Sequence, residues 1–258
     1  MSHCTVRSVI PQPTIDEQNT LIRSLAPVRL RRFRAATKGD RAAVRLYLLD
    51  SQIASQMHAT IRVVEVALRE HIHRALTEAF DERWFSSQRQ LFDQDLCEKI
   101  DKVLLQVGDR APAGAVIAQL MFGSWSSLLG RGGPKQDGTS AGYPATIWKP
   151  ALESGFRDVT RTEARRAAMS LNWARNRISH CEPVVFGFPQ PGLGETGTQV
   201  RRAPSLVLED ARAFTAYFDP ALSAWMRKWN EIDRLLEDPL VSDALDHIAG
   251  EGAVRLER

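Results

Sequence analysis

Residues 160–183 read TRTEARRAAMSLNWARNRISHCEP, and this stretch decides the expected fold class. At about 100° per residue, its apolar side chains fall on one stripe of a helix. Pro183 ends the pattern, because the residue before a proline is pushed out of the helical region. The stretch therefore predicts an amphipathic helix over 160–180. Its apolar stripe consists of Ala164, Ala167, Ala168, Leu171, Ala174 and Ile178.

Helical spacing of apolar residues recurs along most of the chain. The 40–80 segment is the longest helix candidate, with a candidate break near Asp50 and Ser51. Residues 131–142 are glycine-rich and predict a loop, because they lack the GxxxxGK[ST] spacing of the alternative, a phosphate-binding loop. No alternation of strand and helix appears, so the sequence predicts an all-α fold. The other expected helices cover 16–36, 87–107, 113–129, 145–155, 208–236 and 239–248.

Proline and glycine interrupt the helical pattern over residues 183–207. We expect a small irregular or β-hairpin insertion there, with strands around Val184–Phe186 and Gln199–Arg201. The domain prediction is a flexible N-terminal lead-in at 1–15, a single α-helical domain at 16–248 and a C-terminal tail at 249–258.

Composition indicates an ordinary globular protein of 258 residues with 43% hydrophobic residues. A net charge of +3 does not by itself imply nucleic acid. Cys4, Cys97 and Cys181 are too widely spaced for a disulfide framework or a CxxC metal pair, so we expect a reducing cytoplasm. No signal peptide or membrane span is expected. Arginine is concentrated in two segments, 29–45 and 157–177, which suit a phosphate-rich partner or a solvated helix face.

Arg175 and His180 are the candidate chemical pair. A guanidinium binds phosphate, and an imidazole transfers a proton near neutral pH. On one helix the two lie about 7.5 Å apart along the axis and point about 140° apart. Pairing the helix with its own copy would gather both residue types in one groove, so we expect a homodimer. The alternative is that His180 is only a C-terminal cap.

The string from Arg175 to Pro183 closely resembles the RNRxxHxEP signature of Abi-like proteins, the abortive-infection group within the HEPN superfamily. Two other places resemble the same family: Glu65–Arg69, and Phe122–Trp125 followed by Ile147–Trp148. The resemblance implies an HEPN-like helical bundle, usually dimeric, with a metal-independent ribonuclease site at the subunit interface and no cofactor.

The resemblance also implies roles for individual residues. Arg175 and His180 take the catalytic positions, and Asn176 takes the polar position beside the arginine. Glu65 and Arg69 match the supporting pair on the early helix. The chain departs from the family at Glu70, where asparagine is common, and at Cys181, where a second histidine is frequent. Family analogy adds phage defence, or a toxin with a protein or RNA antitoxin.

The first functional hypothesis is therefore an endoribonuclease that cleaves RNA by 2′-OH attack. His180 would accept the proton of the 2′-OH, and Arg175 would offset the charge growing on the phosphorane. The alternatives are a non-catalytic RNA- or nucleotide-binding module and a purely structural helical protein. Further candidate RNA contacts are Asn172, Trp173 and Arg177, with Trp173 suited to base stacking or a dimer contact. The histidines form no recognisable ligand set, so no metal site is expected.

Overall fold

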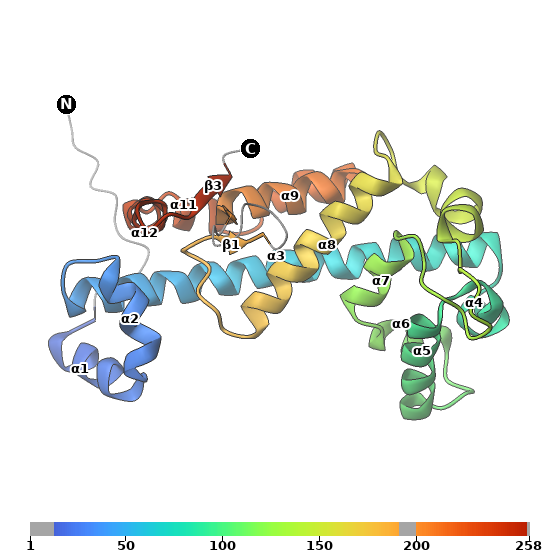
Figure 1. Cartoon of the computed structure of the whole chain (residues 1–258), viewed down its shortest axis with the longest axis horizontal. Coiled ribbons are helices and arrows are strands. Elements are labelled where there is room, and N and C mark those ends of the chain that lie inside the picture. The colour runs from blue at the N-terminus through green and yellow to red at the C-terminus, as the bar shows by residue number, and fades with distance from the viewer. Residues whose placement is uncertain (1–12, 191–199, 257–258) are drawn as a thin grey trace. The chain divides into compact units, whose positions relative to one another are not determined.

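The computed structural model describes residues 13–190 and 200–256 (Figure 1). They are mainly helical with one small sheet, which confirms the predicted all-α fold class with a small hairpin. Most of the predicted N-terminal lead-in lies outside the described residues, and α1 begins at Ile15, capped by Thr14. The helices are α1 Ile15–Ser24, α2 Pro27–Ala35, α3 Asp40–Ala79, α4 Trp84–Ser87, α5 Gln94–Val107, α6 Ala113–Gln119, α7 Phe122–Leu128, α8 Arg161–Ser179, α9 Pro204–Ala216, α10 Pro220–Met226, α11 Ile232–Leu236 and α12 Pro239–Gly250.

Three further helical segments complete the helical part of the described residues. A π-helix, η2, covers Pro144–Leu152, and two 3-10 turns, η1 and η3, cover Arg89–Leu91 and Glu153–Gly155. The segment predicted as one helix over 145–155 is therefore a π-helix followed by a tighter turn. The glycine-rich segment 131–142 contains no helix, as predicted.

Several predicted helices are divided. The 16–36 segment breaks before Pro27, which becomes the first residue of α2, because proline has no N–H to continue the preceding ladder. The 208–236 segment breaks in the same way before Pro220. The 87–107 segment begins its main helix only after Asp93, whose side chain accepts a hydrogen bond from the Leu96 N–H. The 113–129 segment is two helices separated at Leu120.

The chain groups into two compact units, and α3, α8 and α9 each contribute to both. Unit 1 contains the described parts of 1–59, 174–209 and 228–258. Unit 2 contains 60–173 and 210–227.

Unit 1 encloses a core of aromatic and aliphatic side chains around the small sheet. The Phe33 ring lies 5.2 Å from that of Phe186 and 5.5 Å from that of Tyr47. In the sheet, β1 (Phe188–Pro189) pairs antiparallel with β2 (Val200–Arg202), and β3 (Val254–Leu256) pairs parallel with β2. The predicted C-terminal tail thus contributes a strand.

Unit 2 is built around Trp84, which is fully buried between aromatic rings. Its ring contacts Phe85, Phe92 and Trp125 at centroid distances of 5.5–6.3 Å, and its indole N–H donates to His73 Nδ1 at 3.0 Å. In Figure 1, α5 and α6 lie side by side near the C-terminal end of α3. The Phe122–Trp125 motif therefore belongs to the core of this unit.

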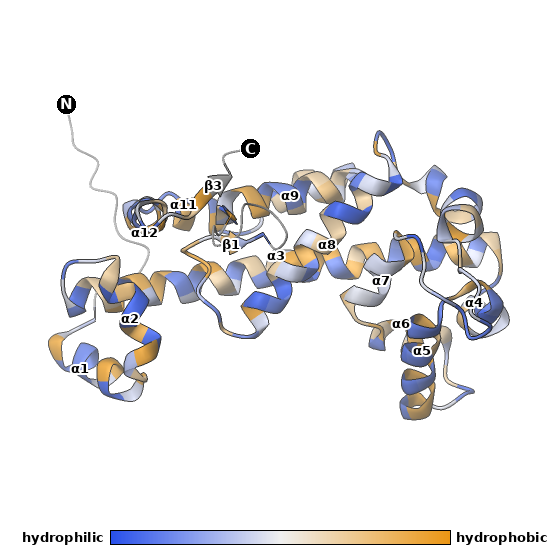
Figure 2. Ribbon diagram, in the orientation of Figure 1, coloured by the Kyte–Doolittle hydropathy of each residue, from blue (hydrophilic) through white to orange (hydrophobic). Residues whose placement is uncertain are grey.

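Polar and apolar residues are interleaved along α3, as Figure 2 shows. Such interleaving is typical of an amphipathic helix with one face on a core. Within residues 13–190 and 200–256, no helix combines the length and the apolar character that crossing a bilayer requires.

Candidate functional site: the end of α8

The α8 helix ends in a Schellman motif formed by the family-like string. The Cys181 N–H donates to Ile178 O at 2.9 Å, and the Glu182 N–H donates to Arg177 O at 3.1 Å. Cys181 has a φ of 53°, in the left-handed region that favours glycine. His180 is therefore the residue that caps the helix, and its exposed side chain lies at the negative end of the helix dipole.

The side chain of Arg177 closes this turn. Its Nη1 donates to Glu182 Oε2 at 2.5 Å, and its Nε and Nη2 donate to Pro183 O at 3.3 and 3.2 Å. From α2, Arg29 Nη1 donates to Cys181 O at 2.8 Å. Arg177, a candidate RNA contact from the sequence, therefore holds the chain that follows α8 in place.

Asp50 fixes the chain that follows Pro183. Its Oδ1 accepts hydrogen bonds from the backbone N–H groups of Val184 and Val185, both at 2.7 Å. The strand predicted at Val184–Phe186 is therefore wrong: these N–H groups bond to a side chain, and β1 forms later, at Phe188. The candidate break at Asp50 is wrong as well, because α3 continues through it.

Burial raises the pKa of Asp50 to about 6. The hydrogen bonds from Val185 and Val184 and the charges of Arg177 and Arg29 oppose that rise. Sequence reasoning missed this residue as part of the site. Its signal was a lone carboxylate directly after the apolar run Leu48–Leu49.

Arg175 is half-buried in the last turns of α8. Its Nη1 donates to Asn176 Oδ1 at 3.3 Å, and Asn176 is exposed. Arg175 and Asn176, which the family resemblance names, thus contact each other on the last turns of α8.

Three arginines of unit 1 concentrate positive charge near the end of α8. The pKa of Arg201 is lowered to about 10, mainly by burial and in addition by the nearby charges of Arg32 and Arg177. Burial also lowers the pKa of Arg32 and of Arg177. All three remain cationic at neutral pH. The guanidinium carbon of Arg32 lies 4.8 Å from the centroid of the Phe186 ring.

Glu65 and Arg69, the predicted supporting pair, lie in unit 2. Arg69 Nη2 is 3.5 Å from Glu65 Oε1, and Arg69 Nη1 donates to Ala118 O at 3.1 Å. Glu65 is buried, whereas the neighbouring Glu70 is exposed. The two side chains form an i, i+4 ion pair. Its support of the α8 site stays a prediction.

Asn172 and Trp173 also belong to unit 2, where they line a groove of about 400 Å³. Trp173 is 45% exposed. The sequence alone gave no sign that the glycine-rich loop 130–133 forms the other side of this groove.

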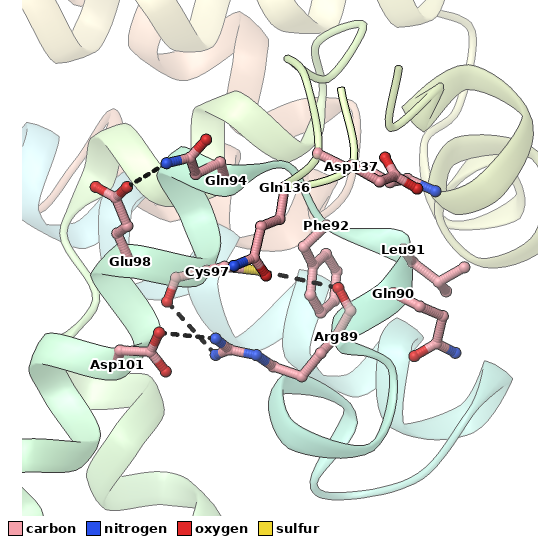
Figure 3. Close-up of a pocket in the computed structure, with 11 residues that line it drawn as sticks. Arg89, Gln90, Leu91, Phe92, Gln94, Cys97, Glu98, Asp101, Gln136 and Asp137 are labelled. Atoms are coloured by element: carbon pink, nitrogen blue, oxygen red, sulfur yellow. Dashed lines mark hydrogen bonds and ion pairs between the residues drawn. The ribbon is translucent and has the colours of Figure 1, made fainter. Parts of the chain in front are cut away.

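A larger cavity of about 840 Å³ lies between the start of α5 and the loop residues 135–137 (Figure 3). The Arg89 side chain reaches across it and donates to Asp101 Oδ2 at 2.8 Å. Cys97 also lines the cavity, but burial raises the pKa of its thiol, which disfavours the nucleophilic thiolate. The paired arginine and the protonated thiol offer no recognisable set of catalytic groups.

Over the described ranges, no group of three or more His, Cys, Asp or Glu side chains is arranged to hold a metal ion. Comparisons with protein-family models, with characterised proteins and with solved structures found no match.

Proposed function

We propose that this protein is a metal-independent endoribonuclease of the HEPN type, with Arg175 and His180 as its catalytic residues. His180 accepts the proton of a ribose 2′-OH, and the 2′-oxygen attacks the adjacent phosphorus. Arg175 offsets the charge that develops on the phosphorane. The 5′-oxygen leaves as a hydroxyl after taking a proton from water, so that a 2′,3′-cyclic phosphate remains.

The observation that carries the proposal is that His180 caps α8 with its side chain exposed. Its ring is exposed and, within the described residues, makes no hydrogen bond or ion pair. By contrast, the backbone around it is held by Arg177 and Arg29. An accessible imidazole on a fixed backbone, five residues after a half-buried arginine, suits proton transfer beside a bound phosphate.

One copy of α8 leaves the site incomplete. The His180 N–H still bonds to Asn176 O at 3.0 Å, so helical geometry applies from Arg175 to His180 and turns their side chains about 140° apart. In addition, a general base is commonly oriented by a further group. We therefore propose a homodimer in which Arg175 of one copy and His180 of the other face the same phosphate.

The test is a cleavage assay on single-stranded RNA in the presence of a chelator. We expect wild-type protein to cut RNA, to leave cyclic phosphate ends and to spare DNA of the same sequence, because DNA lacks the 2′-OH. His180→Ala and Arg175→Ala should each remove cleavage while the helical circular dichroism persists. Arg166→Ala, an exposed arginine of the same helix, is the matched control. Full activity in both site variants would reject the proposal.

The alternative is a non-catalytic RNA- or nucleotide-binding module, and the unoriented ring of His180 favours it. In that case RNA binds with a strong salt dependence and no product forms. Arg175→Ala then weakens binding, whereas His180→Ala has no effect on it.

We also propose a cytoplasmic role in phage defence or as the toxin of a toxin–antitoxin pair, with RNA as substrate and a protein or RNA antitoxin as partner. The support is the resemblance of the Arg175–Pro183 string. Growth arrest on expression of the wild type, relieved in His180→Ala, is the expected result.

A further inference from the structure

We propose that the groove beside Trp173 is a nucleotide subsite for single-stranded RNA. One base stacks on the Trp173 indole, and Arg131 and Arg165 bind the adjoining phosphates. The inference rests on RNA being the substrate, as proposed above, and does not require that the protein cleave it.

The groove lies entirely within unit 2. One side is the face of α8 that carries Arg165, Asn172 and Trp173, and the other is the loop Gly130–Gly133 that follows α7. Its volume of about 400 Å³ is within the range of small-molecule pockets, which is about 300–1,000 Å³. It is therefore large enough for a base and its sugar.

Trp173 supplies the stacking surface. Its side chain is 45% exposed, whereas Trp84 and Trp125 in the same unit are fully buried. A large apolar ring left open at the edge of a polar groove is suited to a flat aromatic ligand. Every nucleobase presents such a face, so this contact does not depend on sequence.

Arg131 and Arg165 supply positive charge that the protein does not neutralise. Both side chains are exposed, and neither makes a hydrogen bond or an ion pair over residues 13–190 and 200–256. The one carboxylate that lines the groove, Asp93, is already engaged: its oxygens accept from the N–H groups of Leu96 and Gly133. The groove thus contains two guanidinium groups that are available to a ligand, whereas its carboxylate already bonds to the backbone.

The loop Gly130–Gly133 is held in place, and its glycines leave space where the ligand would lie. The Asp93 N–H donates to the hydroxyl of the buried Tyr143, and Asp93 in turn holds Gly133 at 2.8 Å. A Cβ at Gly130 would lie 2.8 Å from Ser127 O and 3.2 Å from Arg165 Nε. Glycine at this position therefore lets the loop pack closely against the arginine, and the groove is formed before the ligand binds.

The experiment measures binding of the full chain to a fluorescein-labelled, 2′-O-methylated single-stranded RNA of about 12 nucleotides, which falls within the usual site sizes. This probe has no 2′-OH and is not cleaved. We expect Trp173→Ala to weaken binding by about 5- to 150-fold, the usual cost of removing one stacked base, and Trp173→Phe to retain most of the affinity. Trp225→Ala is the matched control, because Trp225 is 48% exposed in the same unit but does not line the groove.

The charge contacts are tested by salt dependence. For the double variant Arg131→Gln and Arg165→Gln, the slope of log affinity against log salt should fall by roughly 1.4, since each lost phosphate contact to a single strand removes about 0.7. Arg166→Gln should leave the slope unchanged. Thermal unfolding of each variant by circular dichroism confirms that the fold is retained.

The outcomes separate this inference from the proposed function. Groove-dependent binding by a protein that never cuts unmethylated RNA would support the subsite and reject the ribonuclease. Wild-type cleavage with unchanged probe affinity in Trp173→Ala and in the double arginine variant would overturn the subsite and leave the ribonuclease standing. Loss of affinity in Trp173→Ala together with dissociation of the dimer would assign Trp173 to a subunit contact and also overturn it.

Discussion

Asp50 gives a quantitative test of how the end of α8 is held. Its pKa is raised from 3.8 to about 6, mainly by burial. The folded state therefore binds this proton more tightly than the unfolded state does, and between about pH 4 and pH 6 it holds more protons. Stability from this group is fully present below about pH 4 and is lost as pH rises through about 6. At about 1.4 kcal/mol per pKa unit, the loss is about 3 kcal/mol.

Asp50→Asn removes the charge but keeps an oxygen that can accept from Val184 and Val185. We expect the free energy of unfolding at pH 7.5 to exceed that of the wild type by up to about 3 kcal/mol, and the difference to vanish near pH 4. Asp50→Ala removes the acceptor as well. It should lower the free energy of unfolding by about 1–3 kcal/mol for each N–H left unpaired.

The assay is urea unfolding followed by circular dichroism at several pH values between 4 and 8. The difference between Asp50→Asn and wild type at each pH cancels the contributions of other titrating groups. A difference that does not change with pH, or an Asn variant less stable than wild type at pH 7.5, would refute the argument that the buried charge of Asp50 opposes folding.

Three further variants test individual contacts, each by the free energy of unfolding in urea. Cys181→Gly should stabilise the protein by about 1 kcal/mol, because a side chain at φ 53° is strained; equal or lower stability would contradict the Schellman assignment. Arg177→Met should lower the free energy of unfolding by about 1–3 kcal/mol, because the bonds to Pro183 O and Glu182 are lost. An unchanged free energy would show that these bonds do not stabilise the fold. Tyr143→Phe should cost about 1–3 kcal/mol, because the buried Asp93 N–H loses its acceptor; an unchanged value would mean that another acceptor replaces the hydroxyl.

Local rules predicted the parts of the fold that depend on neighbouring residues. The stripe of α8 and its end before Pro183 follow from helical spacing and proline sterics, and the structure has both. The helix breaks at Pro27 and Pro220 also result from proline. They were not predicted, because the apolar spacing continues across each proline and made each segment resemble one helix. Hydropathy periodicity alone does not distinguish one long helix from two helices in phase.

Contacts between distant segments were not predictable in this way. Asp50 bonds to residues more than 130 positions away, and this contact replaced the expected strand at Val184–Phe186. The groove beside Trp173 likewise joins α8 to a loop about 40 positions earlier in the chain. The sequence identified Arg175, Asn176 and His180 as candidates, but what surrounds them depends on the fold.

In the proposed dimer, Arg175 and His180 act on one phosphate from two different copies of the chain. Mixing Arg175→Ala protein with His180→Ala protein tests it, because a mixed dimer contains one intact arginine facing one intact histidine. We expect each variant alone to be inactive and the mixture to recover part of the wild-type RNA cleavage. Mixed dimers that form, as shown by differently tagged chains, and still do not cut RNA would contradict the claim.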